Sequence, residues 1–142
     1  MKVRDVMTSG VVRISPEESV EVAARALAHY NIGVLPVCGW DGKLCGMVTD
    51  RDLVIRCVAA GNRPGQTAVK DVMTGTVVAA QPDMDVEEAA ALMAKQQVRR
   101  LPVLQNSRLC GMVTLGDLAG REETQERAVG VLTNICSNIS SR

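Results

Sequence analysis

The sequence has no phenylalanine, and Tyr30 and Trp40 are its only aromatic residues among 142 positions. Stacking of nucleic-acid bases on aromatic side chains is therefore nearly excluded. The basic excess that is typical of nucleic-acid binding is also missing, because 16 Lys and Arg balance 16 Asp and Glu. No apolar run approaches the roughly 20 residues that a membrane-spanning helix requires. The composition thus predicts no nucleic-acid partner and no membrane partner.

Residue types for catalysis or metal binding are also scarce. The chain has one histidine, His29, and five cysteines without a C-x-x-C pair, which excludes a zinc site of the usual local spacing. No G-x-G-x-x-G, P-loop or G-x-S-x-G motif is present. We therefore predict that the chain is not an enzyme and has no metal site and no obligatory cofactor. His29 is expected at the surface, at the end of a helix where a cation is favoured.

The cysteines and the N-terminus indicate a compartment. An odd number of cysteines without paired spacing is typical of buried thiols in a reducing environment. The first residues, Met1–Asp5, contain no apolar signal region. We therefore expect a cytoplasmic protein.

A tandem repeat is the main feature of the sequence. Three segments recur at a shift of 66 residues, which becomes 65 after one residue is lost: Val3–Thr8 as Val69–Thr74, Leu35–Val37 as Leu101–Val103, and Leu44–Leu53 as Leu109–Leu118. Self-similarity of this extent indicates a duplication. Each half is therefore expected to form the same arrangement of helices and strands.

The first helix of each repeat is predicted from apolar residues at helical spacing. It covers Val20–Tyr30 in the first repeat and Val86–Gln97 in the second. Ser19 and Asp85 precede these helices as capping residues, and Asp85 with Glu88 has the spacing of a capping box. The apolar stripes are Ala23, Ala24 and Leu27, and Ala89, Ala90 and Met93.

Short strands are predicted before and after this helix. The strands after it are Val34–Cys38 and Leu44–Val48, joined through Asp41-Gly42, which is a strong hairpin turn. The second repeat turns around Asn106-Ser107. Before the helix, each repeat has a short β-branched run, at Val11–Ile14 and Thr76–Ala79. A second helix follows Thr49 and Thr114; the first of these is expected to reach Ala60 and to end at Gly61.

Four segments organise the chain. They are repeat 1 (residues 1–61), a linker (62–68), repeat 2 (69–121), and a C-terminal helix and tail (122–142). One face of the C-terminal helix is apolar, formed by Ala128, Val131, Leu132, Ile135 and Ile139. That face either packs on the repeats or meets a second subunit.

The duplicated motifs resemble the CBS-domain pair, or Bateman module, a regulatory module named after cystathionine β-synthase. The motifs that carry the resemblance are Asp-Val-Met-Thr, Leu-Pro-Val and Gly-Met-Val-Thr-x-x-Asp-Leu, each present twice within residues 3–121. The stretch from Ile32 to Gly39, the stretch from Thr49 to Asp52, and the tail with Cys136 resemble the small stand-alone CBS proteins of the hypoxic-response type.

This resemblance implies a fold and a function. The fold is α+β: two βαββα-like repeats related by a pseudo-twofold axis, plus a C-terminal helix. Clefts between the repeats hold adenosine derivatives in this family, namely AMP, ADP, ATP or S-adenosylmethionine. Members usually form homodimers and pass the signal to a partner protein.

Thr49 with Asp52, and Thr114 with Asp117, are the candidate ribose-binding residues. Each pair stands at a strand-to-helix junction, where the threonine is expected to cap the helix. The same helix start can receive a phosphate, and a carboxylate accepts hydrogen bonds from both hydroxyls of a ribose. The resemblance implies that the aspartate binds the ribose and that the threonine approaches the ribose or the phosphate.

Three arginines are the candidate phosphate ligands, because guanidinium groups suit phosphate well. Arg51 lies inside the first Thr-x-x-Asp motif, and Gly116, at the same place in the second motif, is the eighth candidate residue of the nucleotide sites. Arg99 and Arg100 precede the second Leu-Pro-Val strand and read alternatively as the solvated basic end of a helix. The resemblance implies that they reach the Asp52 cleft. That cleft would then prefer phosphorylated adenosine, whereas the Asp117 cleft would bind uncharged adenosyl groups or stay empty.

The sequence therefore leaves three hypotheses about function. The leading hypothesis is a stand-alone regulatory protein that binds an adenine nucleotide. The adenine would lie among residues such as Val11, Val12 and Pro36 and their copies, which fit an ordinary core equally well. The alternative is a structural or interaction protein that has lost nucleotide binding. The third is redox regulation through Cys38 or Cys45, which requires a lowered thiol pKa.

Overall fold

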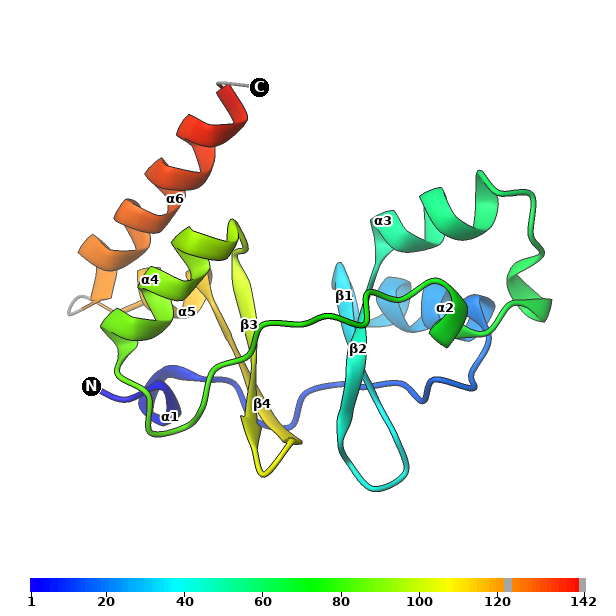
Figure 1. Cartoon of the computed structure of the whole chain (residues 1–142), viewed down its shortest axis with the longest axis horizontal. Coiled ribbons are helices and arrows are strands. Elements are labelled where there is room, and N and C mark those ends of the chain that lie inside the picture. Colours follow the sequence, from blue (N-terminus) through cyan, green and yellow to red (C-terminus); the bar gives the residue numbers. More distant parts are fainter. Residues whose placement is uncertain (122–123, 141–142) are drawn as a thin grey trace. The chain divides into compact units, whose positions relative to one another are not determined.

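The computed structural model describes residues 1–121 and 124–140. It divides into two compact units. Unit 1 comprises residues 1–11 and the chain from residue 78 onward, and unit 2 comprises residues 12–77 (Figure 1). The units cut across the sequence repeats, because the first residues of each repeat belong to the unit built mainly from the other.

Unit 2 contains a two-stranded antiparallel sheet, a helix before it and a helical segment after it. Its elements are α2 (Val20–Tyr30), β1 (Val34–Cys38), β2 (Leu44–Thr49), α3 (Asp50–Leu53), a π-helical continuation η1 (Val54–Val58), and the 3-10 turns η2 (Pro64–Gln66) and η3 (Val69–Asp71). The fully buried side chains of its core include Leu35, Val37, Val48 and Val69.

Unit 1 repeats this arrangement and adds a C-terminal helix. Its elements are α1 (Val3–Val6), α4 (Val86–Gln96), β3 (Arg100–Gln105), β4 (Arg108–Thr114), α5 (Leu115–Ala119) and α6 (Gln125–Ser140). Val3, Met93, Leu101 and Leu118 are fully buried in its core. The predicted α+β class, the two repeats and the C-terminal helix are confirmed.

Local signals placed most of these elements correctly. Ser19 caps α2 by accepting a hydrogen bond from the Val22 N–H at 3.2 Å. The hairpin of unit 2 turns through Gly42 at φ 81°, and the hairpin of unit 1 through Asn106 and Ser107, both at positive φ. The helical segment after Thr49 ends at Val58 rather than Ala60, and Gly61 follows at φ 79°.

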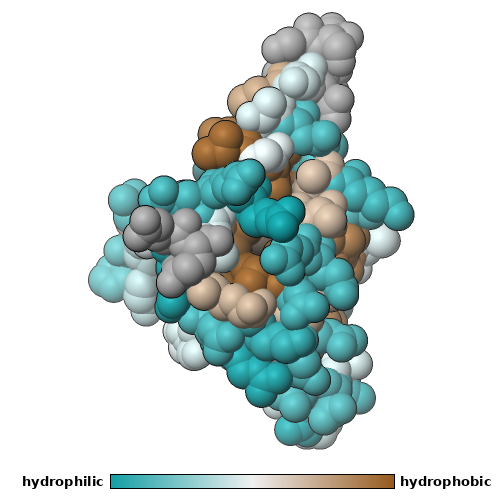
Figure 2. Space-filling model, turned by 90° about the vertical axis from the view of Figure 1, so that its left-hand side faces the viewer, coloured by the Kyte–Doolittle hydropathy of each residue, from teal (hydrophilic) through white to brown (hydrophobic). Residues whose placement is uncertain are grey.

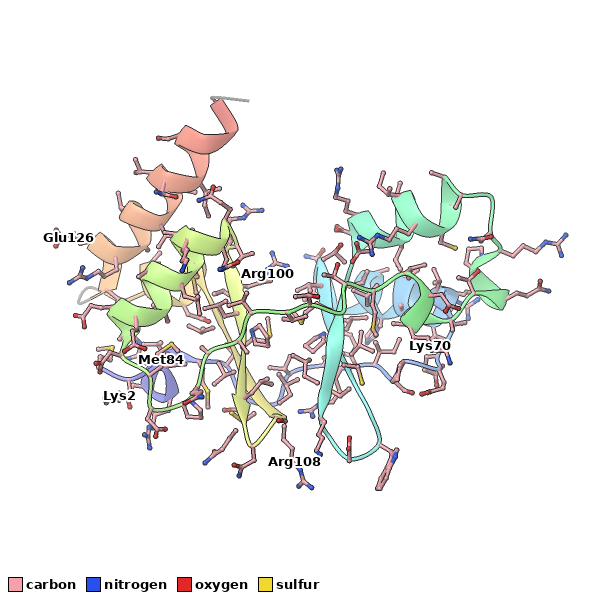
Figure 3. The ribbon with its side chains drawn as sticks, viewed as in Figure 1. Lys2, Lys70, Met84, Arg100, Arg108 and Glu126 are labelled. Carbon is pink, nitrogen blue, oxygen red and sulfur yellow. The ribbon has the colours of Figure 1, made fainter. Side chains whose placement is uncertain are left out.

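The predicted capping box at the start of α4 is wrong. Asp85 stands at the capping position, but its side chain makes no cap hydrogen bond. The carboxylate instead binds Lys2 Nζ at 2.8 Å, and Lys2 comes from a segment 83 residues away in the sequence. The tertiary contact replaces the local one. Figure 3 labels Lys2 and Met84 at the place where the N-terminal segment pairs with the chain before α4.

The β-branched runs before the first helices form no named strands. The run Val11–Ile14 contributes one parallel bridge, from Ile14 to Val37 in unit 2, whereas in unit 1 the parallel bridge to Val103 comes from Ala80, one residue after the run Thr76–Ala79. Ala24, predicted in the apolar stripe of α2, is exposed, whereas its counterpart Ala90 is buried.

The C-terminal helix α6 packs on its own unit. It lies against α4 and α5, with Ala128, Val131 and Ile135 buried. Leu132, which was expected on the same apolar face, is 45% exposed. The side chain of Ile139 and residues 122, 123, 141 and 142 lie outside the described residues. Figure 2 looks toward this side of unit 1, where apolar residues form small patches in a mainly hydrophilic surface.

Among residues 1–121 and 124–140, no helix has the length and apolar character needed to cross a membrane.

Candidate functional site

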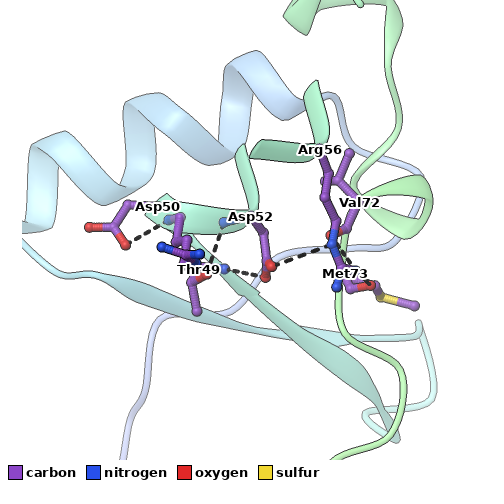
Figure 4. Close-up of polar contacts among 7 residues, drawn as sticks. Thr49, Asp50, Asp52, Arg56, Val72 and Met73 are labelled. Atoms are coloured by element: carbon purple, nitrogen blue, oxygen red, sulfur yellow. Dashed lines mark hydrogen bonds and ion pairs between the residues drawn. The ribbon is translucent and has the colours of Figure 1, made fainter. Parts of the chain in front are cut away.

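The Thr49–Asp52 motif of unit 2 forms a complete capping box where β2 becomes α3 (Figure 4). The Asp52 N–H donates to Thr49 Oγ1 at 3.0 Å, and the Thr49 N–H donates to Asp52 Oδ2 at 3.0 Å. The Asp52 side chain is only 13% exposed. The helix-cap interpretation is therefore confirmed for this motif, and it occupies one oxygen of the carboxylate.

Unit 1 contains the same box at Thr114 and Asp117, where β4 becomes α5. The Asp117 N–H donates to Thr114 Oγ1 at 3.0 Å, and the Thr114 N–H donates to Asp117 Oδ2 at 2.8 Å. In both boxes the Oδ2 atom faces the backbone of its own helix start. Any ligand hydroxyl would therefore bind mainly to Oδ1, because the cap already uses one acceptor site of Oδ2, whereas Oδ1 accepts no hydrogen bond from the described residues.

The sheet of unit 1 places the arginine pair beside the Asp117 box. Arg100 is the register partner of Thr114, and the Arg99 carbonyl accepts a hydrogen bond from the Leu115 N–H at 2.8 Å. Arg99 is exposed and Arg100 half-buried. Five of the eight predicted site residues thus lie at one end of unit 1: Arg99, Arg100, Thr114, Gly116 and Asp117.

Unit 2 gathers the other three predicted site residues, Thr49, Arg51 and Asp52. Arg51 is exposed on the first turn of α3. Where unit 1 has the arginine pair, unit 2 has Gly33 and Val34: Val34 is the register partner of Thr49. The expected approach of Arg99 and Arg100 to the Asp52 cleft concerns residues of different units and stays a prediction.

Two further arginines, which the sequence analysis missed, accompany these boxes. Arg56 Nη1 donates to the carbonyls of Met73 at 3.2 Å and Val72 at 3.4 Å, and Arg56 Nε lies 3.9 Å from Asp52 Oδ1 (Figure 4). Arg121 Nη2 donates to the carbonyl of Asp5 at 2.8 Å. Extending the repeat alignment by three residues would have found them, because a shift of 65 places Arg56 on Arg121.

The Asp-Val-Met-Thr segments complete the sheets next to these boxes. In unit 2, Met47 and Thr74 exchange backbone hydrogen bonds of 3.0 and 2.9 Å. In unit 1, Thr8 and Met112 do the same at 2.8 and 2.9 Å. The Asp-Val-Met-Thr motif of each repeat therefore pairs with the Gly-Met-Val-Thr motif of the other repeat.

A pocket of about 460 Å³ lies at the opposite end of the unit 1 sheet. Its lining includes Pro82, Asp83, Leu104, Asn106 and Ser107, close to the β3–β4 hairpin. None of the predicted site residues lines it. Of the residues suggested around adenine, Pro36 and its copy Pro102 are buried, whereas Val11 and Val12 are half-buried.

The cysteines only partly follow the prediction of buried thiols. Cys38 and Cys57 are buried and Cys110 is half-buried, but Cys45 and Cys136 are exposed. Burial raises the pKa of the Cys38 thiol, which makes it less reactive and weakens the redox hypothesis for that residue. His29 is exposed, as predicted. Within the described part of the chain, no group of three or more His, Cys, Asp or Glu residues is placed to hold a metal ion.

The duplicated sheets, the exchanged segments and the paired capping boxes agree with the comparisons with known proteins. The CBS-domain model matches residues 3–58 and 69–123, so the chain belongs to the CBS-domain family. Stand-alone CBS-domain proteins are generally regulatory rather than catalytic.

Small CBS proteins are similar to this chain over nearly their whole length. CBS domain-containing protein YhcV of Bacillus subtilis is 44% identical over 94% of each chain. Hypoxic response protein 1 of Mycobacterium tuberculosis is 36% identical over 94% of this chain and 93% of its own. The predicted resemblance to hypoxic-response-type proteins is confirmed.

Solved structures show the same fold. Hypoxic Response Protein I, crystallised with two coordinated zinc ions, has a TM-score of 0.78 at 36% identity, covering 84% of this chain and 98% of that one. The CBS domain pair of protein MJ0100, crystallised with 5-methylthioadenosine and S-adenosyl-L-methionine, has a TM-score of 0.74 at 27% identity, with the same coverage.

Proposed function

We propose that this chain is a regulatory CBS protein that binds an adenosine derivative, such as AMP, ADP, ATP or S-adenosylmethionine. The ribose would bind at the aspartate of a Thr-x-x-Asp box. The observation that carries the proposal is the geometry of these boxes. Each cap uses the Oδ2 atom and leaves Oδ1 with acceptor capacity. The adenosine ligands in the related MJ0100 structure support the same ligand class.

Arginines supply the phosphate-binding part of the proposal. Arg51 lies in the Asp52 box, whereas Arg99 and Arg100 lie beside the Asp117 box of their own unit. Whether the arginine pair acts with Asp52, as the resemblance implies, or with Asp117 is decided by a double-mutant cycle of AMP affinities. Arg108 is the matched control, because it stands at the other end of the unit 1 sheet from Arg100 (Figure 3).

Titration calorimetry with adenosine, AMP, ATP and S-adenosylmethionine tests the ribose role. Asp52→Asn and Asp117→Asn keep an acceptor for the cap but replace the other oxygen with a donor. The double variant is expected to lose binding by about tenfold or more, because hydrogen bonds to a charged group contribute about 1.5–3 kcal/mol each. Asp50→Asn, a change to an exposed neighbour on α3, should leave the affinity unchanged.

A second candidate function is a ligand-free interaction protein. The observation that favours it is an exposed apolar surface on η1, where Val54, Ile55 and Val58 are 55%, 51% and 61% exposed. A thermal-shift screen separates the two functions, since a ligand at 100 times its Kd stabilises the fold by about 2.7 kcal/mol. Melting temperatures that none of the four compounds changes would favour the interaction protein.

The proposal also includes a homodimer, a protein partner and a cytoplasmic location. Binding would alter the dimer or partner surface, and a ligand can do so only by its different affinities for two states. Sedimentation with and without AMP tests the dimer. Cell fractionation tests the location.

A further inference from the structure

The two Thr-x-x-Asp boxes have the same backbone geometry but differ at the second carboxylate oxygen. In unit 2, Asp52 Oδ1 faces the guanidinium of Arg56 at 3.9 Å. In unit 1, Asp117 Oδ1 has no hydrogen bond and no ion pair with any residue that the structure describes. The equivalent arginine, Arg121, instead donates to the Asp5 carbonyl.

We propose that Arg56 determines the ligand preference of the Asp52 site: it disfavours uncharged adenosine and favours adenosine that carries a phosphate. This inference rests on the proposed function and deepens it. An uncharged ribose would bind at Asp52 Oδ1, where the Arg56 guanidinium 3.9 Å away partly compensates the carboxylate charge and so weakens the hydrogen bonds that it accepts. A phosphate gives the guanidinium a second anion, and Arg56 is half-exposed, with 52% of its side chain accessible.

The Asp117 site is expected to lack this discrimination. Its Oδ1 atom accepts ribose hydroxyls without competition from Arg121, so adenosine and AMP differ there only through Arg99 and Arg100. The two sites therefore differ in their preference for phosphate because Arg56 lies beside Asp52, whereas its counterpart Arg121 binds the Asp5 carbonyl.

The test measures the affinity ratio of AMP to adenosine at each site separately. In an Asp117→Asn background, Arg56→Gln should raise adenosine affinity and lower AMP affinity, so that the ratio falls about tenfold. In an Asp52→Asn background, Arg121→Gln is the matched control. Like Arg56→Gln, it removes an arginine that donates to a backbone carbonyl, but Arg121 forms no ion pair with Asp117. The affinity ratio of AMP to adenosine should therefore stay unchanged.

The outcomes separate the inference from the proposed function. An unchanged ratio in Arg56→Gln, with binding still measurable, overturns the inference and leaves the function standing. No binding of adenosine, AMP, ATP or S-adenosylmethionine to the unmodified chain overturns the proposed function and the ligand preference together.

A second measurement needs no ligand. Asp52→Asn and Arg56→Gln are expected to lower the melting temperature by less in combination than the sum of their single effects, because they remove one shared interaction. Asp117→Asn and Arg121→Gln should be additive. Additivity in both pairs would contradict the inferred restraint of Asp52 by Arg56.

Discussion

At the scale of the residue, two equivalent glycines allow the exchanged segments to approach the sheets. A Cβ atom at Gly46 would lie 2.5 Å from the Thr74 carbonyl oxygen, and one at Gly111 would lie 2.8 Å from the Thr8 carbonyl oxygen. Both oxygens are backbone atoms held by the hydrogen bonds that they accept from Met47 and Met112. The repeated Gly-Met-Val-Thr motif therefore has a packing reason for its glycine, independent of any ligand.

Gly46→Ala and Gly111→Ala are each expected to destabilise the protein by about 1–3 kcal/mol, the usual cost of overpacking a close contact. Urea unfolding measures the change. Gly75→Ala is the control, because nothing lies within 4 Å of its Cβ position and its φ is not positive. A loss for Gly75→Ala as large as for Gly46→Ala would contradict the steric explanation.

Some residues of the candidate site could be predicted from the sequence and others could not. The Thr-x-x-Asp caps follow from three-residue spacing, so sequence alone found them. Arg56 is equally local to Asp52, four residues on, but its role depends on the carbonyls of Val72 and Met73, which belong to the other repeat. Such a contact is visible only once the fold brings the segments together.

At the scale of the element, the two β-hairpins use different residues at the positive-φ positions of their turns. Unit 2 uses Gly42 at φ 81°, whereas unit 1 uses Asn106 at 54° and Ser107 at 66°. Two-residue turns with positive φ at both positions favour Asn-Gly. Ser107 therefore carries backbone strain that a glycine would not.

Ser107→Gly is expected to stabilise unit 1 by about 0.5 kcal/mol, the relief of left-handed strain less the entropy that glycine adds to the unfolded chain. Chemical denaturation monitored by circular dichroism measures the change. Ser9→Gly is the control, since Ser9 is exposed and not at positive φ, and it should be neutral or slightly destabilising. Equal effects of the two variants would refute the strain argument.

The attachment of the N-terminal segment to α4 depends on pH. The Lys2 ammonium beside Asp85 lowers the pKa of that carboxyl, and Asp85 raises the pKa of Lys2. A lowered carboxyl pKa contributes stability above its unfolded value, about 3.9, and the contribution is lost as pH falls through the folded value. The raised Lys2 pKa reflects the same ion pair: its contribution is present below the unfolded lysine pKa and is lost as pH rises through the folded value.

We therefore expect Asp85→Asn to lower the melting temperature slightly at pH 7 and not at pH 2. Both side chains are about half exposed, so the difference at pH 7 should shrink in 1 M salt. Differential scanning calorimetry at the two pH values measures it. Asp83→Asn, which changes the weaker pair with Arg4 at 3.3 Å, should have a smaller effect. A salt-independent effect would argue against the ion pair.

The start of helix α4 shows why part of the fold could not be predicted from the sequence. Helix α2 and the strand β1 followed from caps, periodicity and turns, all of which are local, whereas β3 was expected from the duplication. Asp85 has the same local signal as Ser19, but Lys2 occupies its carboxylate, and no pattern near α4 indicates this partner. Local sequence signals predicted the helices and strands, whereas contacts between distant residues determined which helix caps form.

At the scale of the whole molecule, the duplication and the compact units follow different boundaries. The chain passes from one unit to the other after Val11 and again after Val77, which are equivalent positions of the repeats. The predicted linker, residues 62–68, lies within unit 2, where the Thr67 carbonyl accepts a hydrogen bond from the Val20 N–H at 2.8 Å. The residues that a core needs are therefore not all contained in one repeat.

The fragment of residues 12–77 is accordingly expected to fold, whereas the fragment of residues 1–61 is not. The shorter fragment lacks Val69 and Val72, which are 0% and 1% exposed in the core of unit 2, and Thr74, which pairs with Met47. A domain of about 60 residues is marginally stable, so the loss of two buried valines is decisive.

Thermal unfolding and amide dispersion in NMR spectra measure the outcome. Val72→Asp in the fragment of residues 12–77 is the control and should abolish its cooperative transition. If residues 1–61 fold alone and residues 12–77 do not, the sequence repeat rather than the contact-defined unit is the folding unit.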